Sequence, residues 1–242
     1  MKKLAIIPAR YNSSRFPGKP LIDLAGKTMI QRVYEGVNDS QLFDEVVVAT
    51  DDQRILKHIK KIGGKALLTS EAHESGTERC GEVINTYNNF DIVVNIQGDE
   101  PLVNAHQLAQ LLSAFEDEKV EIATLGTPKI STHDRHDSNR IKIVLNRFSD
   151  ALYFSRSPIP FERNEENYPF LKHIGLYAFK SDTLRELVQL KSTLLEKTES
   201  LEQLRWMFYG YKIRVVETQI ETPNIDTPED VKIILEKLKD IH

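Results

Sequence analysis

Three apolar runs, separated by segments with helical spacing, constrain the fold of this chain more than any other feature. The runs are Leu4–Ile7, Glu45–Thr50 and Asp91–Gln97. Each resembles a strand that is buried on both faces of a sheet. Between the first two runs, the apolar residues of Met29–Val37 recur at helical spacing. Strands that alternate with helices predict an α/β fold, with a mostly parallel sheet covered on both faces.

The rest of the chain supplies further expected elements. Pro8 is expected to end the first strand, because proline has no N–H for a sheet ladder. We expect further strands at Ala66–Leu68, Val120–Leu125, Ile141–Leu145, Lys172–Phe179 and Ile213–Val216. We expect helices after Asp51 or Asp52, after the segment His73–Arg79, at Asp182–Leu190, at Glu199–Tyr209, and after Thr227, which would cap the last helix. Residues 151–156 are apolar and aromatic for a loop region, which indicates a covered surface such as a partner subunit.

Three polar loops follow the apolar runs, at Pro8–Lys19, Thr50–Asp52 and Gln97–Glu100. Ligands of open parallel sheets bind beyond the carboxyl ends of the strands. We therefore expect these loops on one rim of the sheet.

The first of these loops carries three permanent cations, Arg10, Arg15 and Lys19, among small residues. Small residues let backbone N–H groups approach a ligand, and the cations supply counter-charge, a combination that suits a polyphosphate. The loop matches neither the G-x-G-x-x-G turn nor the G-x-x-x-x-G-K-[ST] loop. The alternative is an ordinary solvated basic loop, since surface Arg and Lys are the norm.

Two carboxylates are candidates for a magnesium site. Asp99 follows a buried strand between Gly98 and Pro101, and Asp226 precedes the last helix. Mg²⁺ prefers oxygen ligands and would neutralise charge during phosphoryl or nucleotidyl transfer. Each aspartate alone is more commonly a turn or cap residue. Because the sequence holds no legible nucleophile–base triad, it indicates positioning and charge stabilisation rather than covalent catalysis.

Composition narrows the classes of function. The chain has 242 residues, a net charge of −4 and one cysteine, Cys80. The charge disfavours non-specific nucleic-acid binding, which needs a basic face. One cysteine cannot form an intrachain disulfide and fits a reducing compartment. Since no apolar run reaches the length of a membrane span, we expect a cytoplasmic protein without a membrane partner.

Eight segments in this order and spacing carry a resemblance to a known family. They are IPARYNSSRFPGKPL, VATDD, HESGTER, NIQGDEP, ALYFSRSPIPF, KHIGLYAF, ESLEQLRWMFYG and NIDTPED. Together they closely resemble the 3-deoxy-manno-octulosonate (KDO) cytidylyltransferases, from about Leu4 to the last helix. HESGTER and the stretch from KHIGLYAF to LEQLR are more specific than the opening loop, which other sugar-nucleotide synthetases share in looser form.

The resemblance implies a Rossmann-like nucleotidyltransferase fold, with a mixed, mostly parallel sheet flanked by helices. It implies one domain over 1–242, with a small dimerisation module at about 130–200 that makes a homodimer. The implied reaction joins CTP and KDO, an acidic eight-carbon sugar, to give CMP-KDO and pyrophosphate for lipopolysaccharide synthesis. The sugar's anomeric hydroxyl would attack the α-phosphorus in line, with Mg²⁺ as cofactor.

The resemblance also implies roles for particular residues. The catalytic set would be Arg10, Lys19, Asp99 and Asp226, the last two as Mg²⁺ ligands. The CTP-binding set would be Pro8, Ala9, Arg10, Arg15, Lys19, Ala49, Thr50, Asp51, Ser75, Gly76 and Thr77. The sugar-binding set would be Arg79, Gln97, Arg156, His173, Tyr177, Glu202 and Gln203. One departure is visible: residues 137–140 read Asp-Ser-Asn-Arg where the family usually has an Asn-Pro-Asn type of turn.

Three alternatives stay open at this point. A cytidylyltransferase for a related acidic sugar, such as 8-amino-KDO or a sialic acid, would share Arg79 and Gln97. A glycosyltransferase of related fold typically carries Asp-x-Asp at the metal strand, whereas this chain reads Asp99-Glu100-Pro101. A non-catalytic nucleotide-binding module would bind CTP whether or not Mg²⁺ is present.

Overall fold

The computed structural model describes residues 1–12, 16–164 and 168–239. It divides into two compact units. Unit 1 comprises Met1–Leu108 and the chain from Thr222 onward, and unit 2 comprises Ala109–Glu221. The first boundary falls inside α4 (Ala105–Ser113). None of the helices in the described ranges has the length and apolarity that a membrane span requires.

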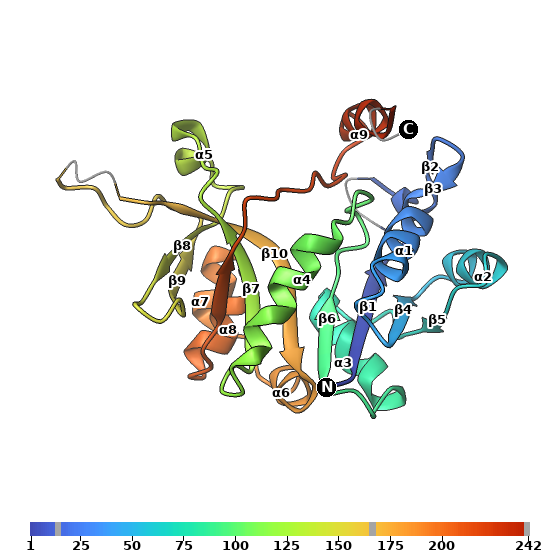
Figure 1. The fold of residues 1–242 in the computed structure, drawn as a ribbon, viewed down its shortest axis with the longest axis horizontal. Coiled ribbons are helices and arrows are strands. Elements are labelled where there is room, and N and C mark those ends of the chain that lie inside the picture. The colour runs from blue at the N-terminus through green and yellow to red at the C-terminus, as the bar shows by residue number, and fades with distance from the viewer. Residues whose placement is uncertain (13–15, 165–167, 240–242) are drawn as a thin grey trace. The chain divides into compact units, whose positions relative to one another are not determined.

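Unit 1 contains a parallel sheet in the order β6-β1-β4-β5 (Figure 1). The strands are β1 (Lys3–Ala9), β4 (Glu45–Thr50), β5 (Ala66–Leu68) and β6 (Ile92–Asn95), and β2 (Asp23–Leu24) pairs with β3 (Lys27–Thr28) in a separate hairpin. The helices are η1 (Lys19–Leu21), α1 (Met29–Asp39), α2 (Gln53–Lys61), α3 (Gly76–Thr86) and α9 (Asp230–Lys239). The sequence predictions for β4 and β5 match the observed bounds.

The core of unit 1 explains why these segments form strands. Leu4, Ile6, Val47 and Val93 have no exposed surface, and their apolar neighbours in these strands are buried as well. Burial of each such side chain stabilises the fold by about 1.5–3 kcal/mol. A second cluster joins the C-terminal segment to the start of the chain, through Leu24, Met29, Ile225, Ile234 and Leu238. It therefore fixes the segment that carries Asp226 within unit 1.

The prediction that Pro8 ends the first strand is wrong. β1 continues to Ala9, and Pro8 pairs with Ala49 of β4. The pairing of β1 with β6 stops at Ile6, so no β6 residue pairs with Pro8. Proline lacks only the N–H, and here it keeps a partner strand on one side, as edge positions allow.

Unit 2 contains a mixed sheet. β7 (Ile122–Thr127) lies between β11 (Arg214–Glu217), which is parallel to it, and β10 (Leu171–Lys180), which is antiparallel. β8 (Lys142–Leu145) pairs antiparallel with both β10 and β9 (Ala151–Ser155). The helices are η2 (Ala114–Glu116), α5 (Thr132–His136), α6 (Ser181–Leu187), α7 (Leu194–Glu199) and α8 (Gln203–Phe208).

Three expectations for the later chain need correction. Ala151–Ser155 is strand β9 rather than a loop, because it pairs in register with β8. The helix expected at Glu199–Tyr209 spans only Gln203–Phe208 (α8), since Glu199 is the last residue of α7, which ends at Ser200 in a left-handed conformation (φ 50°). The last helix begins at Asp230, and the Thr227 hydroxyl donates to the Asp230 carboxylate at 3.1 Å instead of capping the helix.

Candidate active site

The carboxyl ends of β1, β4 and β6 meet at one rim of unit 1, as the sequence predicted. A cavity of about 520 Å³ opens at this rim, and its lining residues include Arg10, Lys19, Gly76, Gln97 and Asp99. The lining also includes Pro8 and Ala9 at the end of β1. Two of the three predicted loops, Pro8–Lys19 and Gln97–Glu100, therefore contribute to one concave site, which is the usual place for a small ligand in an α/β sheet, whereas Thr50–Asp52 does not line the cavity.

Gly98 sets the distance between two of these loops. A Cβ placed on Gly98 would lie 2.5 Å from the carbonyl oxygen of Pro8. That distance is shorter than any tolerable van der Waals contact, so only glycine allows this approach. The Asp99 loop is thereby held against the end of β1.

Lys19 links the two predicted metal ligands. Its Nζ donates to Asp99 Oδ2 at 2.7 Å and to the carbonyl oxygen of Ile225 at 2.8 Å, and lies 3.8 Å from Asp226 Oδ1. The backbone N–H of Ile225 also donates to the Asp99 carbonyl at 2.9 Å. The structure thus brings together the loop cation and both acids, which are far apart in the sequence.

Arg10 adds an available cation to the rim cavity. Its Nη2 is buried and has no hydrogen-bond partner among the described residues. A buried guanidinium nitrogen without a partner is costly, and an anionic ligand would satisfy it. Arg15, the third cation predicted for this loop, lies outside the described residues.

The segments predicted to surround cytidine lie at the ends of two elements of unit 1. Ala49 and Thr50 are fully buried at the end of β4, and the Thr50 hydroxyl accepts from the Asp52 N–H at 3.2 Å. The Ser75 hydroxyl caps α3 by accepting from the Glu78 N–H at 3.1 Å. Gly76 and Thr77 then open the helix. The N-terminus of a helix offers backbone N–H groups and a favourable dipole to a negatively charged ligand.

Arg79 is fully buried and already paired in unit 1. Its Nη2 donates to Asp51 Oδ2 at 2.8 Å, and its Nη1 forms a short hydrogen bond with the Thr69 hydroxyl. Its Nε has no partner among the described residues. A predicted sugar-pocket residue and a predicted cytidine-pocket residue therefore form one ion pair.

The remaining sugar-pocket candidates, apart from Gln97 at the rim of unit 1, lie in unit 2. His173 Nε2 bonds the Thr124 hydroxyl at 3.0 Å, and its ring packs against Tyr177. Burial lowers the pKa of His173 to about 3, so its imidazole is neutral at physiological pH. Burial also raises the pKa of Tyr177, and the charge of Glu202 raises it further. These groups can serve as neutral hydrogen-bonding partners of sugar hydroxyls.

Gln203 and Arg156 occupy contrasting environments in unit 2. Gln203 Nε2 is buried and unpartnered among the described residues. The Arg156 guanidinium, in contrast, donates to three backbone carbonyls, those of Ser138, Glu199 and Ser200. Arg156 therefore holds the turn that precedes Glu202 and Gln203.

Sequence reasoning missed two acidic residues beside the site. Glu100 accepts from the Thr222 hydroxyl at 3.0 Å, and burial, with the adjacent Asp99 charge, raises its pKa to about 7. Asp230 accepts from the backbone N–H groups of Asp226 and Thr227 at 2.9 and 2.8 Å. Glu100 lies in the motif QGDEP and Asp230 in NIDTPED, and these motifs were the sequence signals that could have identified them.

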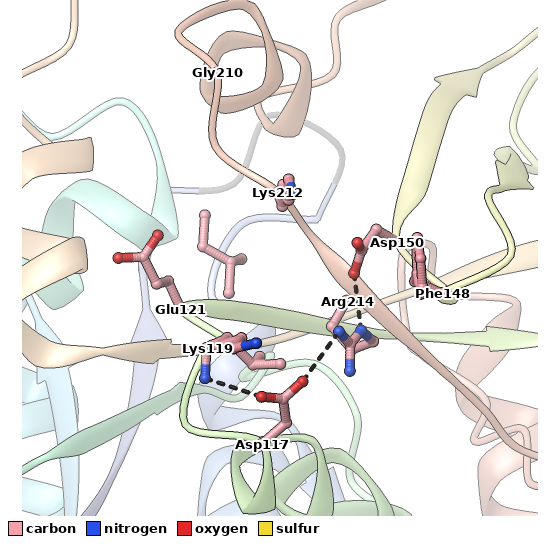
Figure 2. Close-up of a pocket in the computed structure, with 10 residues that line it drawn as sticks. Asp117, Lys119, Glu121, Phe148, Asp150, Gly210, Lys212 and Arg214 are labelled. Atoms are coloured by element: carbon pink, nitrogen blue, oxygen red, sulfur yellow. Dashed lines mark hydrogen bonds and ion pairs between the residues drawn. The ribbon is translucent and has the colours of Figure 1, made fainter.

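A second cavity of about 500 Å³ lies in unit 2, and Figure 2 shows Arg214 between the carboxylates of Asp117 and Asp150. The Arg214 Nε donates to Asp150 at 2.8 Å, and its Nη2 to Asp117 at 3.4 Å. The lining also includes Lys119, Lys212 and Glu121, so three cations face three carboxylates. In this cavity Arg214 is already paired with two carboxylates, whereas in the rim cavity Arg10 has an Nη2 without a partner among the described residues.

Comparisons with known proteins identify the family of this chain. The model of the cytidylyltransferase family matches residues 4–214. A 3-deoxy-manno-octulosonate cytidylyltransferase of Parabacteroides distasonis is 49% identical, with 96% of each chain covered. One of Bacteroides thetaiotaomicron is also 49% identical, with 99% of each covered.

This chain belongs to the 3-deoxy-manno-octulosonate cytidylyltransferase family. The solved structure of a CMP:2-keto-3-deoxy-manno-octonic acid synthetase in complex with CTP matches with a TM-score of 0.95, at 43% identity and full coverage of both chains. A 4-diphosphocytidyl-2C-methyl-D-erythritol synthase of Anaerococcus prevotii shares the fold at 15% identity, with a TM-score of 0.66 and 98% and 99% coverage. The predicted nucleotidyltransferase fold is thereby confirmed.

The described ranges hold no cluster of three or more His, Cys, Asp or Glu side chains arranged for a metal ion. The metal site predicted in the sequence consists of two aspartates only, so its protein ligands would leave most coordination positions to other groups.

Proposed function

We propose that this chain transfers CMP from CTP to KDO, giving CMP-KDO and pyrophosphate. Family membership sets the reaction, and one observation supports its location: Lys19, Asp99 and the Asp226 segment converge at the rim cavity of unit 1. That arrangement offers positive groups for a triphosphate and two carboxylates for a metal ion. Nucleotidyl transfer needs both.

Mg²⁺ is the proposed cofactor, and the residues fit it. Asp99 and Asp226 present oxygen ligands of the kind that Mg²⁺ prefers, and a cation, the Lys19 ammonium, already contacts both carboxylates. Mg²⁺ usually keeps several water or phosphate ligands, so two carboxylates are enough to hold it. When bound, it would neutralise charge on the phosphates and lower the barrier to attack at the α-phosphorus.

The chain's own residues would do the positioning. Arg10, Lys19 and Arg15 would bind the triphosphate, with the greatest gain as charge grows on the departing pyrophosphate. The end of β4 and the start of α3, with Asp51, would enclose cytidine. The anomeric hydroxyl of the sugar would then attack the α-phosphorus in line, and no covalent enzyme intermediate is required.

KDO is a carboxylate sugar rich in hydroxyl groups. We propose that Gln97, His173, Tyr177, Glu202 and Gln203 bind its hydroxyls, and that Arg79 provides the charge partner for its carboxylate. Gln203 Nε2, which has no partner among the described residues, and the neutral His173 support this assignment. Arg156 would contribute by holding the turn at Ser200.

We also propose a homodimer formed through residues 130–200, acting in the cytoplasm. Leu152 and Phe161 in this segment are 57% and 88% exposed. A partner subunit would remove this apolar surface from water, which favours association. A single buried cysteine is consistent with a reducing compartment.

Pyrophosphate release with CTP and a panel of acidic sugars tests this function. The panel is KDO, 8-amino-KDO and a sialic acid, each with and without Mg²⁺. We expect Mg²⁺-dependent release with KDO at the highest kcat/KM. Release with another sugar but not with KDO would replace the substrate assignment, and CTP binding without any release would favour a non-catalytic module.

A further inference from the structure

The Lys19 ammonium contacts both of the carboxylates that the proposed function assigns to a metal cation. It uses one N–H on Asp99 and another on the Ile225 carbonyl, and it lies 3.8 Å from Asp226. The Lys19 side chain is 14% exposed, and those of Asp99 and Asp226 are 24% and 38% exposed. At this partial burial, an opposite charge within 4 Å is stabilising by several times its value in bulk water.

The same oxygen atoms are the ones that a divalent cation would need. An ammonium offers a compact single charge with three donors, and it binds carboxylates through hydrogen bonds. Mg²⁺ binds carboxylate oxygens directly and brings twice the charge. A carboxylate oxygen that accepts a hydrogen bond from Lys19 is less available to the metal, so the two cations oppose each other at this pair of acids.

We propose that Lys19 competes with the divalent cation for Asp99 and Asp226. When the metal binds these carboxylates, the Lys19 ammonium leaves them and binds the triphosphate. This inference rests on the proposed function, because it needs Asp99 and Asp226 to be the metal ligands. It gives Lys19 two successive partners. Without nucleotide the ammonium neutralises the acids, and with nucleotide and metal it neutralises phosphate oxygens.

The competition makes metal binding depend on the nucleotide. CTP favours metal binding in two ways, by adding phosphate oxygens as ligands and by drawing Lys19 away from the carboxylates. Removing the Lys19 charge should therefore strengthen binding of the metal alone, although it weakens binding of CTP. A lysine that served only to bind phosphate would leave the affinity for the metal alone unchanged.

The test is binding of Mn²⁺ alone, measured by electron paramagnetic resonance on the full chain without nucleotide. The variants are Lys19→Met, which keeps the side-chain length, and Arg10→Met, which removes a charge from the same cavity without touching the two acids. We expect Lys19→Met to lower the Mn²⁺ dissociation constant at least about tenfold, and Arg10→Met to change it much less. Equal or weaker Mn²⁺ binding by Lys19→Met, or an equal gain in both variants, would overturn the proposal.

Thermal unfolding provides a second measurement, which stays informative if one variant folds poorly. Mg²⁺ should raise the unfolding temperature of Lys19→Met more than that of the wild type, since binding to the native state stabilises it. The same comparison with Lys19→Gln should agree. No extra Mg²⁺ stabilisation in either variant would contradict the competition. The failure of the proposed function is separate: it is the absence of CMP-KDO formation by the wild type.

Discussion

Lys19 Nζ lies 2.7 Å from Asp99 Oδ2, although 80 positions separate the two residues in the chain. The contact joins the loop after β1 to the loop after β6, two strands that lie side by side in parallel. Ile225, a member of the apolar cluster of unit 1, bonds to both residues through its backbone. The two candidate metal ligands and the loop cation are thus positioned by the same core that stabilises the unit.

Asp99→Asn should reduce turnover by at least about a hundredfold. The change keeps the volume and removes the negative charge that would hold the metal. Steady-state pyrophosphate release measures the effect, and the far-ultraviolet circular dichroism spectrum should stay that of the wild type. Near-normal turnover would show that Asp99 is not a metal ligand.

Gly98→Ala should destabilise unit 1 and lower activity. The new Cβ would lie 2.5 Å from the Pro8 carbonyl oxygen, so the two loops must separate. Overpacking of this kind costs about 1–3 kcal/mol of unfolding free energy. Gly175→Ala is the matched control, because a Cβ there meets nothing within 4 Å. Urea unfolding compares the two, and equal stabilities would contradict the close approach.

Asp51→Asn should be strongly destabilising, because it leaves the fully buried Arg79 guanidinium without its counter-charge. Breaking a buried pair from one side costs about 3–5 kcal/mol. Asp52→Asn is a matched control in the next position, since Asp52 pairs with the exposed Arg54 and Asn can still cap α2. If urea unfolding finds the same small loss of unfolding free energy for Asp51→Asn and Asp52→Asn, the Arg79–Asp51 pair contributes little to stability.

Stability should fall below pH 6.5 through His173. Its pKa of about 3 in the native state lies below the ordinary value near 6.5 in the unfolded chain. The unfolded state therefore binds the proton first, and the stabilisation present above pH 6.5 is lost as the pH falls toward 3. Between pH 7 and 5.5 the wild type should lose about 1 kcal/mol more unfolding free energy than His173→Asn. Parallel pH profiles would refute a buried neutral imidazole.

The sequence predicted the parts of the fold that local pattern determines. β4 and β5 were predicted with their observed bounds, because apolar runs bounded by polar residues mark buried strands. The position of the polar loops on one rim of the sheet followed from the predicted parallel order of the strands. The extension of β1 past Pro8 depends on where its neighbour β6 ends. The end of α7 at Ser200 depends on one residue in a left-handed conformation. Neither feature could be predicted from the sequence pattern.

The sequence named candidate residues for the site but not the partners that these residues have in the structure. The resemblance named Lys19, Asp99, Arg79 and Asp51, yet neither the Lys19–Asp99 contact nor the Arg79–Asp51 pair could be read from spacing. Such pairs depend on where separate loops meet in space. Glu100 and Asp230 escaped notice because their roles rest on contacts with Thr222 and with the Asp226 backbone.

The most direct test of the account is phosphorus-31 NMR of the wild type with CTP and KDO, during a titration with Mg²⁺. We predict that CMP-KDO and pyrophosphate appear together, in equal amounts, only when the divalent cation is present, and that Asp226→Asn suppresses both. Product formed at full rate in the presence of a chelator, or no CMP-KDO at any Mg²⁺ concentration, would contradict the account.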